Sequence, residues 1–194
     1  MSRIPSSRKQ ATHERIVEVA SRAVRRKGFG GAGVAEVMKE AGLTHGGFYA
    51  HFDTREAMLA EAVDRAGSDT VAALSRIAAD APADQALSTV IRAYLSSAHV
   101  ERAETGCAIV ALGSDMPRQS PDVRAAATRR IKELVDLVSR QLPGWGQPGA
   151  HEQALVTVAT MVGALLLARA VDDPRLSEAV RDAALKHLTS DQRG

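Results

Sequence analysis

The chain has 194 residues, of which 45% are hydrophobic and 25% charged, and its formal net charge is +2. This composition excludes disordered and fibrous proteins and allows one large hydrophobic core or two smaller ones. The single cysteine, Cys107, excludes an internal disulfide, and with a polar N-terminus that lacks an apolar signal segment it predicts a cytoplasmic protein.

Positive charge is concentrated in the first part of the chain. Residues 1–55 contain 10 Lys and Arg against 5 Asp and Glu, a balance of +5, whereas residues 56–194 contain 15 against 18, a balance of −3. A basic first third is suited to attracting phosphate groups. The residues expected to contribute are Arg3, Arg8, Lys9, Arg22, Arg25, Arg26 and Lys27. For residues 25–27 an ordinary solvated helix face is an equally good interpretation.

The first two predicted helices end at glycines. Apolar residues recur at helical spacing over residues 9–27, and Gly28 ends that helix. A second helix is predicted over residues 34–41, after which Gly42 supplies a tight left-handed turn. Thr44 is then a candidate N-cap, with a hydroxyl that can accept an amide hydrogen bond, for a third helix over residues 45–50.

Two glycines, Gly46 and Gly47, lie inside this third segment. Each glycine in a helix interior costs about 1 kcal/mol relative to alanine, so a compensating reason is expected. Close approach of the backbone to a ligand is one such reason. A simple loop between helices is the alternative interpretation.

The residues around these glycines separate into apolar and polar roles. Phe48 and Phe52 are four residues apart and are candidate core anchors, whereas Tyr49, His51 and Arg55 can donate hydrogen bonds to phosphate. Four of the six aromatic residues of the chain lie between positions 29 and 52, which predicts a compact miniature core that holds the segment rigid.

The remainder of the chain also has the pattern of helices. A long helix is predicted from residue 53 or 54 to about Ala79, before Pro82, and further helices are predicted at about 83–100, 105–113, 121–142, 149–170 and 174–188. The apolar run over residues 155–171 contains polar side chains and is short for a membrane span of about 20 residues, so a buried helix is predicted there. The expected fold class is all-α, with a three-helix N-terminal domain over residues 1–53 and a larger helical domain over residues 54–194.

The N-terminal pattern resembles the DNA-binding domain of the TetR family of bacterial repressors. The resemblance covers residues 15–58 and is most specific in the run AGLTHGGFYAHF, followed by Thr54, Arg55 and Glu56. It implies a helix-turn-helix domain followed by an effector-binding and dimerisation domain. Carried over residue by residue, it implies phosphate contacts from Thr44 and Tyr49, base contacts from His45 and Gly46 with Gly47 beside them, a supporting role for His51, and a phosphate clamp by Arg55.

The chain departs from the family pattern at four positions. Gly33 stands where a Ser or Thr hydroxyl usually caps the first helix of the motif, and Met38 replaces a small residue where the two helices cross. Gly47 and Ala50 replace residues that are usually larger. The preferred operator sequence therefore does not follow from the resemblance.

The last two predicted helices have faces rich in Leu and Ala. They can close the core of a single chain, but the resemblance favours a two-fold, four-helix interface in a homodimer. The candidate interface residues are Leu155, Val158, Val162, Leu166, Leu176, Val180 and Ala184.

The resemblance also implies a pocket for a small, often apolar effector in the second domain. The candidate lining residues are Tyr94, Ala98, Cys107, Val110, Ala111, Met116 and Trp145. Ordinary core packing explains Val110 and Met116 equally well. Cys107 opens a predicted helix, where the dipole and free amides lower the pKa of a thiol, so it is a candidate sensor of oxidants or electrophiles. A small inert buried hydrophobe is the commoner role of such a cysteine.

These features together predict a ligand-responsive transcriptional regulator, a repressor that a small molecule releases from a palindromic operator. The expected partners are double-stranded DNA, the effector and a second copy of the chain, without a membrane, a metal or another cofactor. An enzyme is disfavoured because the six histidines lack metal-site spacing and no Gly-rich phosphate loop is present. A helical scaffold that has lost affinity for DNA is a third class, left open by Gly33, Gly47 and Ala50.

Overall fold

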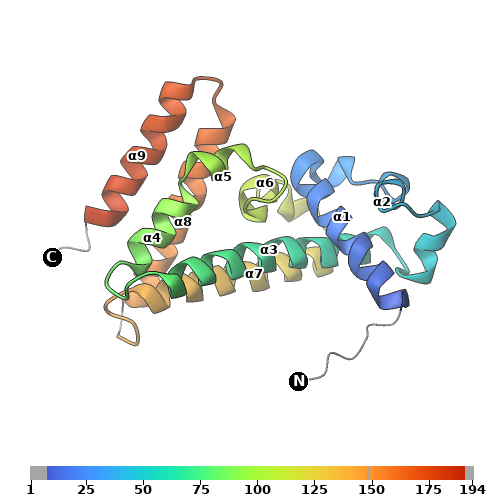
Figure 1. Ribbon diagram of the computed structural model, residues 1–194, viewed down its shortest axis with the longest axis horizontal. Helices are drawn as coiled ribbons and strands as arrows, with labels where there is room; N and C mark the ends of the chain where they lie inside the picture. Colours follow the sequence, from blue (N-terminus) through green and yellow to red (C-terminus); the bar gives the residue numbers. More distant parts are fainter. Residues whose placement is uncertain (1–7, 148, 191–194) are drawn as a thin grey trace.

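The computed structural model describes residues 8–147 and 149–190, and every regular element in this part of the chain is helical (Figure 1). The prediction of an all-α fold is therefore confirmed. The elements are α1 (Arg8–Gly31), α2 (Val34–Glu40), the 3-10 helix η1 (His45–Ala50), α3 (Arg55–Asp80), α4 (Ala86–Tyr94), α5 (Ser97–Glu101), α6 (Ala108–Leu112), the 3-10 helix η2 (Met116–Arg118), α7 (Pro121–Gln141), α8 (Ala150–Ala170) and α9 (Pro174–Ser190).

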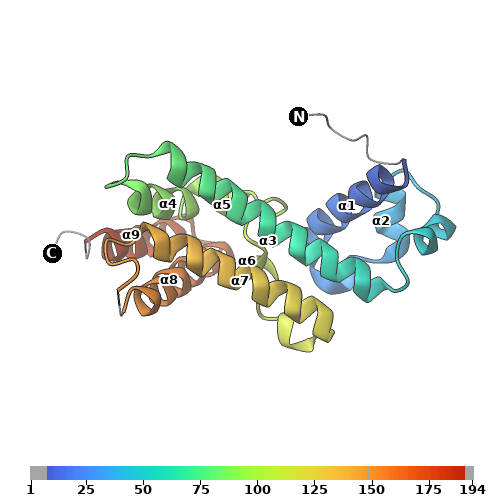
Figure 2. The same ribbon diagram turned by 90° about the horizontal axis from the view of Figure 1, so that it is seen from below.

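Helix α3 connects two ends of an elongated molecule. Helices α3 and α7 lie side by side in both views (Figures 1 and 2). One end of α3 packs against α1, and its other end packs against α4. We call the segment from α1 to η1, residues 8–50, the head, and the remaining described residues the body.

Two of the predicted boundaries differ from the structure because single residues redirect the chain. Gly28 has a φ of +69°, the left-handed conformation that favours glycine, but the helix resumes beyond this kink and continues to Gly31. The helix predicted over residues 83–100 is divided into α4 and α5. The division occurs at Ser96, whose backbone is extended and whose hydroxyl accepts a hydrogen bond from the N–H of His99 at 3.2 Å, which caps a new helix.

The start and end of α3 lie within one or two residues of the predicted ones. The hydroxyl of Thr54 accepts a hydrogen bond from the N–H of Ala57 at 3.1 Å and caps the helix, which ends at Asp80, two residues before Pro82. The helix predicted over residues 105–113 is shorter in the structure, since only α6 forms there.

Buried side chains form two clusters. The first joins the head to the N-terminal half of α3 and to residues of α6 and α7, and the second joins α4, α7 and α8. Core residues of α3 from Met58 to Ala66 belong to the first cluster. The hydrophobic core of the head therefore continues across residue 53, and the domain boundary there stays a prediction.

Helix α8 is buried on one side only. Ala154, Met161 and Leu165 pack in the second cluster, whereas Val156 and Leu167 are exposed. Within the described residues it is the one helix whose length and composition, with a mean hydropathy of 1.6, would suit a membrane span, a test that core helices of soluble proteins also pass. The prediction of a buried helix therefore holds for its inner face only, because the outer face is apolar and uncovered in the single chain.

Candidate nucleic-acid interface

The turn between α2 and η1 is built on Gly42. This residue has a φ of +68°, its N–H donates to Lys39 O at 3.0 Å, and the N–H of Leu43 donates to Met38 O at 2.8 Å. These are the two hydrogen bonds of a Schellman motif, in which a glycine ends a helix without a steric penalty. The predicted glycine turn is thus present, and it directs the chain into η1.

Thr44 begins η1 but does not cap it with its hydroxyl. Its backbone is extended, and no side-chain capping bond forms; instead the N–H of Gly47 donates to Thr44 O at 3.0 Å. The predicted hydroxyl cap is therefore wrong, because residues 45–50 form a 3-10 helix, in which backbone hydrogen bonds close over three residues. The exposed side chain of Thr44 lies at the surface next to His45.

The fold itself does not require glycine at position 46 or 47. Neither residue has a positive φ. A Cβ atom on Gly46 would have no neighbour within 4 Å, and one on Gly47 would make ordinary contacts, 3.5 Å from Thr44 Oγ1 and 3.7 Å from Met38 Cε. The two glycines instead leave a bare stretch of backbone on the surface of η1, which is the property that close approach to a ligand requires.

A miniature aromatic core holds η1 in place. Phe48 and Phe52 are buried, with stacked rings whose centroids are 5.5 Å apart, and the ring of Phe52 also stacks on His13 of α1 at 4.5 Å. Tyr49 contacts Phe48 edge to face at 5.3 Å but is 68% exposed. The predicted separation is therefore present, with Phe48 and Phe52 as buried anchors and Tyr49 facing outward. Met38 of α2 is buried beneath η1.

His51 and Arg55 are both partly buried. The guanidinium of Arg55 donates to Phe29 O, so it joins the end of α1 to the start of α3. A phosphate clamp by its other N–H groups stays a prediction. Burial lowers the pKa of His51, and His13 and Lys9 lower it further, so that this imidazole is neutral at pH 7. Its Nδ1 atom is buried without a hydrogen-bond partner among the residues that the structure describes.

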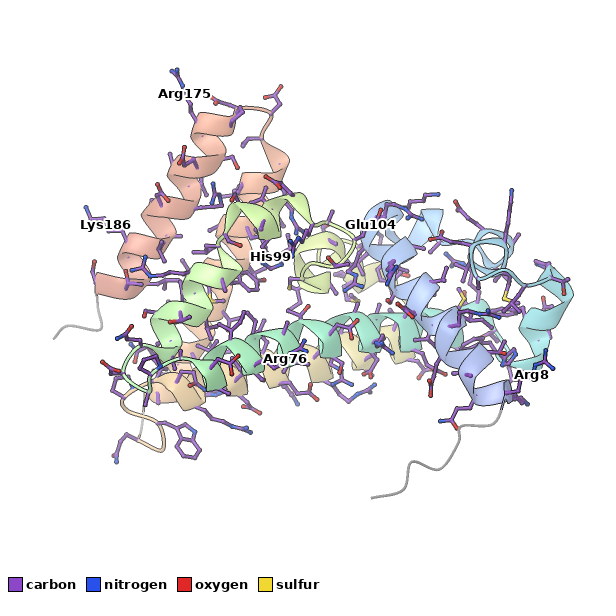
Figure 3. The ribbon with its side chains drawn as sticks, in the orientation of Figure 1. Arg8, Arg76, His99, Glu104, Arg175 and Lys186 are labelled. Carbon is purple, nitrogen blue, oxygen red and sulfur yellow. The ribbon has the colours of Figure 1, made fainter. Side chains whose placement is uncertain are left out.

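Three basic residues in the second half of α1 pair with carboxylates. Arg22 pairs with Glu18 at 2.6 Å, Arg26 pairs with Glu40 at 2.9 Å, and Lys27 pairs with Glu36. The solvated-face interpretation therefore fits Arg26 and Lys27. Arg8, labelled in Figure 3, is exposed at the start of α1. Lys9 is exposed as well, and the predicted contribution of Arg3 lies outside the described residues.

A second candidate site is an apolar cavity of about 210 Å³ between α3, α6 and α7. It contains two of the predicted effector residues, Cys107 and Met116. Its lining residues are Val63, Gly67, Thr70, Val71, Cys107, Ala108, Ile109, Gly113, Met116, Ala127, Arg130, Ile131 and Leu134.

The other predicted effector residues lie elsewhere. Tyr94 and Val110 are buried in the second core cluster, and Ala111 packs partly buried against the first. Ala98 lines a separate cavity of about 200 Å³, and Trp145 is 62% exposed in the loop between α7 and α8. None of these five residues therefore lines the cavity that contains Cys107 and Met116.

Residues of α3 and α7 were missing from the predicted pocket although they form most of its wall. A Cβ atom on Gly67 would lie 2.5 Å from Cβ and Cγ of Arg130, so glycine allows the stem of this arginine to cross α3. Arg130 then reaches Asp64, with Nε 3.1 Å from Oδ1. Burial raises the pKa of Asp64, but hydrogen bonds from Arg130 and Arg129 outweigh that effect and hold it below its ordinary value. The spacing of lining residues along α3, at 63, 67, 70 and 71, is the helical signal that could have found this wall.

The predicted dimer residues divide by burial. Leu155, Leu166 and Leu176 are exposed apolar side chains on α8 and α9. Val158 faces the core of its own chain, so it is not available to a partner in this conformation. The other three, Val162, Val180 and Ala184, are partly buried against the same core, and the exposed residues Val156 and Leu167 extend the apolar face beyond the predicted set.

The head is a helix-turn-helix with an outward-facing η1, and it is joined to a helical body that contains a cavity. This is the architecture of a helix-turn-helix transcriptional regulator. Residues 16–62 match the family model of bacterial regulatory proteins of the tetR family, and residues 82–183 match the model of the C-terminal domain of LmrA/YxaF-like transcriptional regulators. The chain belongs to the TetR family of bacterial transcriptional regulators, as the N-terminal resemblance predicted.

Similar proteins agree in length and architecture. The HTH-type transcriptional regulator Rv0196 of Mycobacterium tuberculosis is 31% identical over 170 residues, which cover 82% of this chain and 85% of that protein. The fold is similar to the crystal structure of reduced Escherichia coli NemR, with a TM-score of 0.78, 22% identity and coverage of 92% and 96% of the two chains. A TetR-family regulator from Cytophaga hutchinsonii gives a TM-score of 0.79 with 18% identity, covering 96% and 98%.

Proposed function

We propose that the chain is a cytoplasmic homodimeric repressor that binds a palindromic operator through η1 and is released by a small apolar molecule in the α3–α6–α7 cavity. The observation that carries this proposal is the surface of η1. Its backbone is bare at Gly46 and Gly47, although the fold would accept side chains there, and the exposed residues His45 and Tyr49 flank the bare stretch.

In this proposal η1 enters the major groove, which is wide enough to admit a helix. His45 and the backbone at Gly46 and Gly47 face base edges. Thr44 and Tyr49 donate hydrogen bonds to phosphates on either side, contacts that fix the orientation of the head but carry no sequence information. The buried pair Phe48 and Phe52 keeps the segment rigid, so little conformational entropy is lost on binding.

The second copy of the chain supplies the other half-site. The outer face of α8 and the start of α9 expose apolar residues in one chain, among them Leu155, Leu166 and Leu176. Burying such faces against each other is the usual way in which bundle helices dimerise. A two-fold dimer holds two copies of η1 about one DNA turn, or a multiple of it, apart, which favours a palindromic operator.

The effector acts by selecting a conformation. A cavity with an apolar lining favours an apolar ligand, since each polar group transferred there without a hydrogen-bond partner is costly. A ligand that fits the cavity better when the heads are apart shifts the population away from the DNA-binding state.

Selection of binding sites from random duplexes tests the proposal as a whole. The purified protein is expected to enrich a palindrome whose half-sites are separated by about one helical turn or a multiple, with affinity that falls steeply as salt rises. Enrichment of no sequence, together with salt-independent binding, would instead identify a helical protein without DNA-binding function.

The roles of Tyr49 and His45 predict different effects on the selected duplexes. Tyr49→Ala is expected to lower affinity for every duplex about tenfold or more, because a hydrogen bond to a charged phosphate contributes roughly 1.5–3 kcal/mol. His45→Ala is expected to change the preferred bases at one position of each half-site. Both are measured by fluorescence anisotropy with matched and mismatched duplexes. Trp145→Ala, which removes a similarly exposed aromatic residue from the loop between α7 and α8, is the control and should bind as the parent does.

The proposed dimer face predicts that Leu166→Glu separates the protomers. Two-fold symmetry places the new carboxylate in the interface twice, and an unpaired buried charge costs about 3–5 kcal/mol. Sedimentation velocity should show monomers at micromolar concentration, and affinity for the full palindrome should fall towards that for a half-site. Trp145→Glu adds the same charge at another exposed apolar position and should remain dimeric. A dimeric Leu166→Glu protein would place the interface elsewhere.

A further inference from the structure

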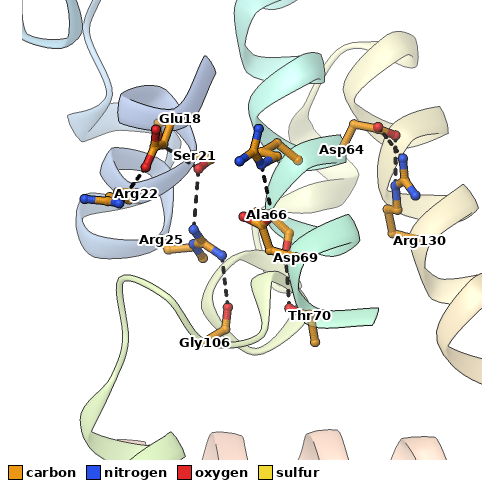
Figure 4. Close-up of polar contacts among 11 residues, drawn as sticks. Glu18, Ser21, Arg22, Arg25, Asp64, Ala66, Asp69, Thr70, Gly106 and Arg130 are labelled. Carbon is orange, nitrogen blue, oxygen red and sulfur yellow. Dashed lines mark hydrogen bonds and ion pairs between the residues drawn. The ribbon is translucent and has the colours of Figure 1, made fainter. Parts of the chain in front are cut away.

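Arg25 of α1 is a buried cation at the junction between the head and the body. It is 6% exposed. Its Nη1 donates to Gly106 O and its Nη2 donates to Ser21 Oγ, both at 3.4 Å (Figure 4). Its Nε is buried without a partner among the described residues. Only two of its five N–H donors are therefore used in the contacts found, and both hydrogen bonds are long.

The charge of Arg25 has little direct compensation. Burial lowers the pKa of its guanidinium, and the carboxylate of Asp69 opposes that effect. Asp69, however, accepts a hydrogen bond from Arg65 at 2.9 Å rather than from Arg25. A guanidinium stays protonated even so. A buried charge with incomplete hydrogen bonding makes the free energy of the structure sensitive to small displacements of its partners.

Gly106, the acceptor of Arg25, is firmly attached to the wall of the cavity. It immediately precedes Cys107, Ala108 and Ile109, which line the cavity. A Cβ atom on Gly106 would lie 2.5 Å from Arg169 Nη2 and 2.7 Å from Arg102 O, so the backbone here is tightly enclosed. The carbonyl of Gly106 therefore cannot shift independently of this wall.

His99 fixes the same segment from the body. The N–H of Cys107 donates to His99 Nε2 at 3.0 Å, while His99 Nδ1 donates to Tyr94 O at 2.7 Å. This pattern requires a neutral ring, and burial lowers the pKa of His99 accordingly. Arg169 of α8 in turn donates to the carbonyl of His99. A continuous set of contacts thus runs from α8 through the cavity wall to α1.

We propose that Arg25 is the positioning residue that couples the cavity to the DNA-binding head, an inference that rests on the function proposed above. A ligand that displaces the wall moves Gly106 O away from the guanidinium, and the buried charge then loses its one hydrogen bond to the body. The position of α1 that suits DNA binding is no longer favoured, and the head reorients. Since coupling is reciprocal, DNA bound to the head must in turn stabilise the wall at Gly106 and Cys107.

The neighbouring residue Arg26 provides a matched control. It also joins α1 to the same loop, through Glu104 at 3.3 Å, and it pairs with Glu40 on α2. Figure 3 labels Glu104 on this loop, beside the end of α1. Both ion pairs are solvent-exposed, and exposed pairs contribute little because water and salt screen them. If any contact between the head and this loop were enough for coupling, Arg26 would couple the cavity wall to the head as well as Arg25 does.

The test uses Cys107, the one thiol of the chain, as a reporter of the wall. Because Cys107 is buried, iodoacetamide alkylates it only when the wall opens. Its alkylation rate is measured by mass spectrometry in the full-length protein, with and without a saturating duplex selected as above. In the parent protein we expect DNA to slow alkylation about tenfold, within the usual range of coupling between sites. The quantity compared is the ratio of the alkylation rate without DNA to the rate with DNA. In Arg25→Met this ratio should be one, whereas Arg26→Met should keep the parental ratio.

The design separates coupling from a merely structural role. A structural role would change the alkylation rate equally in the free and the DNA-bound protein and would leave the ratio of the two rates unchanged. Methionine is similar in volume to the buried stem, and replacing a buried charge by an apolar side chain is often neutral for stability. Arg25→Lys keeps the charge but cannot span Ser21 and Gly106, so it should also lose the ratio. A parental ratio in both Arg25 variants, or no effect of DNA in the parent, would overturn the inference alone. Failure of the parent to bind any duplex would overturn the proposed function as well.

Discussion

Gly46→Glu is expected to abolish binding to duplex DNA while leaving the fold intact. A Cβ atom added at position 46 meets no protein atom within 4 Å, and η1 does not need the conformational freedom of glycine there. The new carboxylate would stand between the helix backbone and the bases, close to two rows of phosphates. Like charges brought together in an interface cost several kcal/mol, which predicts a loss of about 100-fold or more.

Anisotropy titration with the selected duplex measures this effect, and thermal unfolding shows that the head is still folded. Gly144→Glu is the control, because Gly144 also has no neighbour within 4 Å of an added Cβ but lies in the loop between α7 and α8. It adds the same charge to the molecule and should bind DNA as the parent does. If Gly46→Glu binds with parental affinity, the bare surface of η1 does not contact DNA.

Phe48→Ala is expected to unfold the head. Phe48 is almost completely buried and stacks on Phe52, and it supports Tyr49 edge to face. Truncating a buried phenylalanine costs about 3–5 kcal/mol, a large part of the 5–15 kcal/mol that stabilises a typical domain. Urea unfolding should show an early transition or a clearly lower midpoint, with DNA affinity lost together with the structure.

The adjacent variant Tyr49→Ala separates stability from binding. Tyr49 is mostly exposed, so its removal should change the free energy of unfolding by about 0.5 kcal/mol or less while it weakens DNA binding. Phe48→Ala should mainly lower the free energy of unfolding, and the loss of DNA affinity should follow from the loss of structure. An unchanged urea midpoint in Phe48→Ala would mean that the aromatic pair does not hold η1.

The proposed allosteric mechanism has a simple physical basis. The hydrophobic core is continuous from the head through α3 to α6 and α7, so packed side chains connect the head to the body. Packed interfaces of this kind move between discrete arrangements rather than deforming gradually. A contact with incomplete hydrogen bonds, such as that between Arg25 and Gly106, is a suitable place for a small shift in the body to change which arrangement is favoured.

Local signals in the sequence were sufficient for the helix-turn-helix. Gly42 was predicted as a turn because a left-handed residue favours glycine, and the structure gives it a φ of +68°. Thr44 was correctly predicted to start the next segment, but its hydroxyl does not cap it. Propensities identify a helix start well, whereas the choice between α and 3-10 geometry in six residues depends on tertiary packing, which for η1 includes α2.

The cavity could be predicted only in part. Two of the predicted pocket residues, Cys107 and Met116, line the observed cavity. Gly67 and Arg130 are not predicted, since these two residues lie more than 60 positions apart in the sequence and meet only where α3 and α7 pack together. Trp145 is predicted to line the pocket, yet it is 62% exposed in its loop.

The amino-acid sequence by itself determined the helical class, the turn at Gly42, the bare pair Gly46 and Gly47 and the aromatic anchors, because each depends on residues within a few positions of one another. Only the tertiary structure decided which side of α8 remains uncovered, which helices enclose the cavity, and that Arg25 is buried against Gly106 while Arg26 next to it is not. The reason is that burial and long-range hydrogen bonds depend on how distant segments pack, which the periodicity of a single helix does not specify.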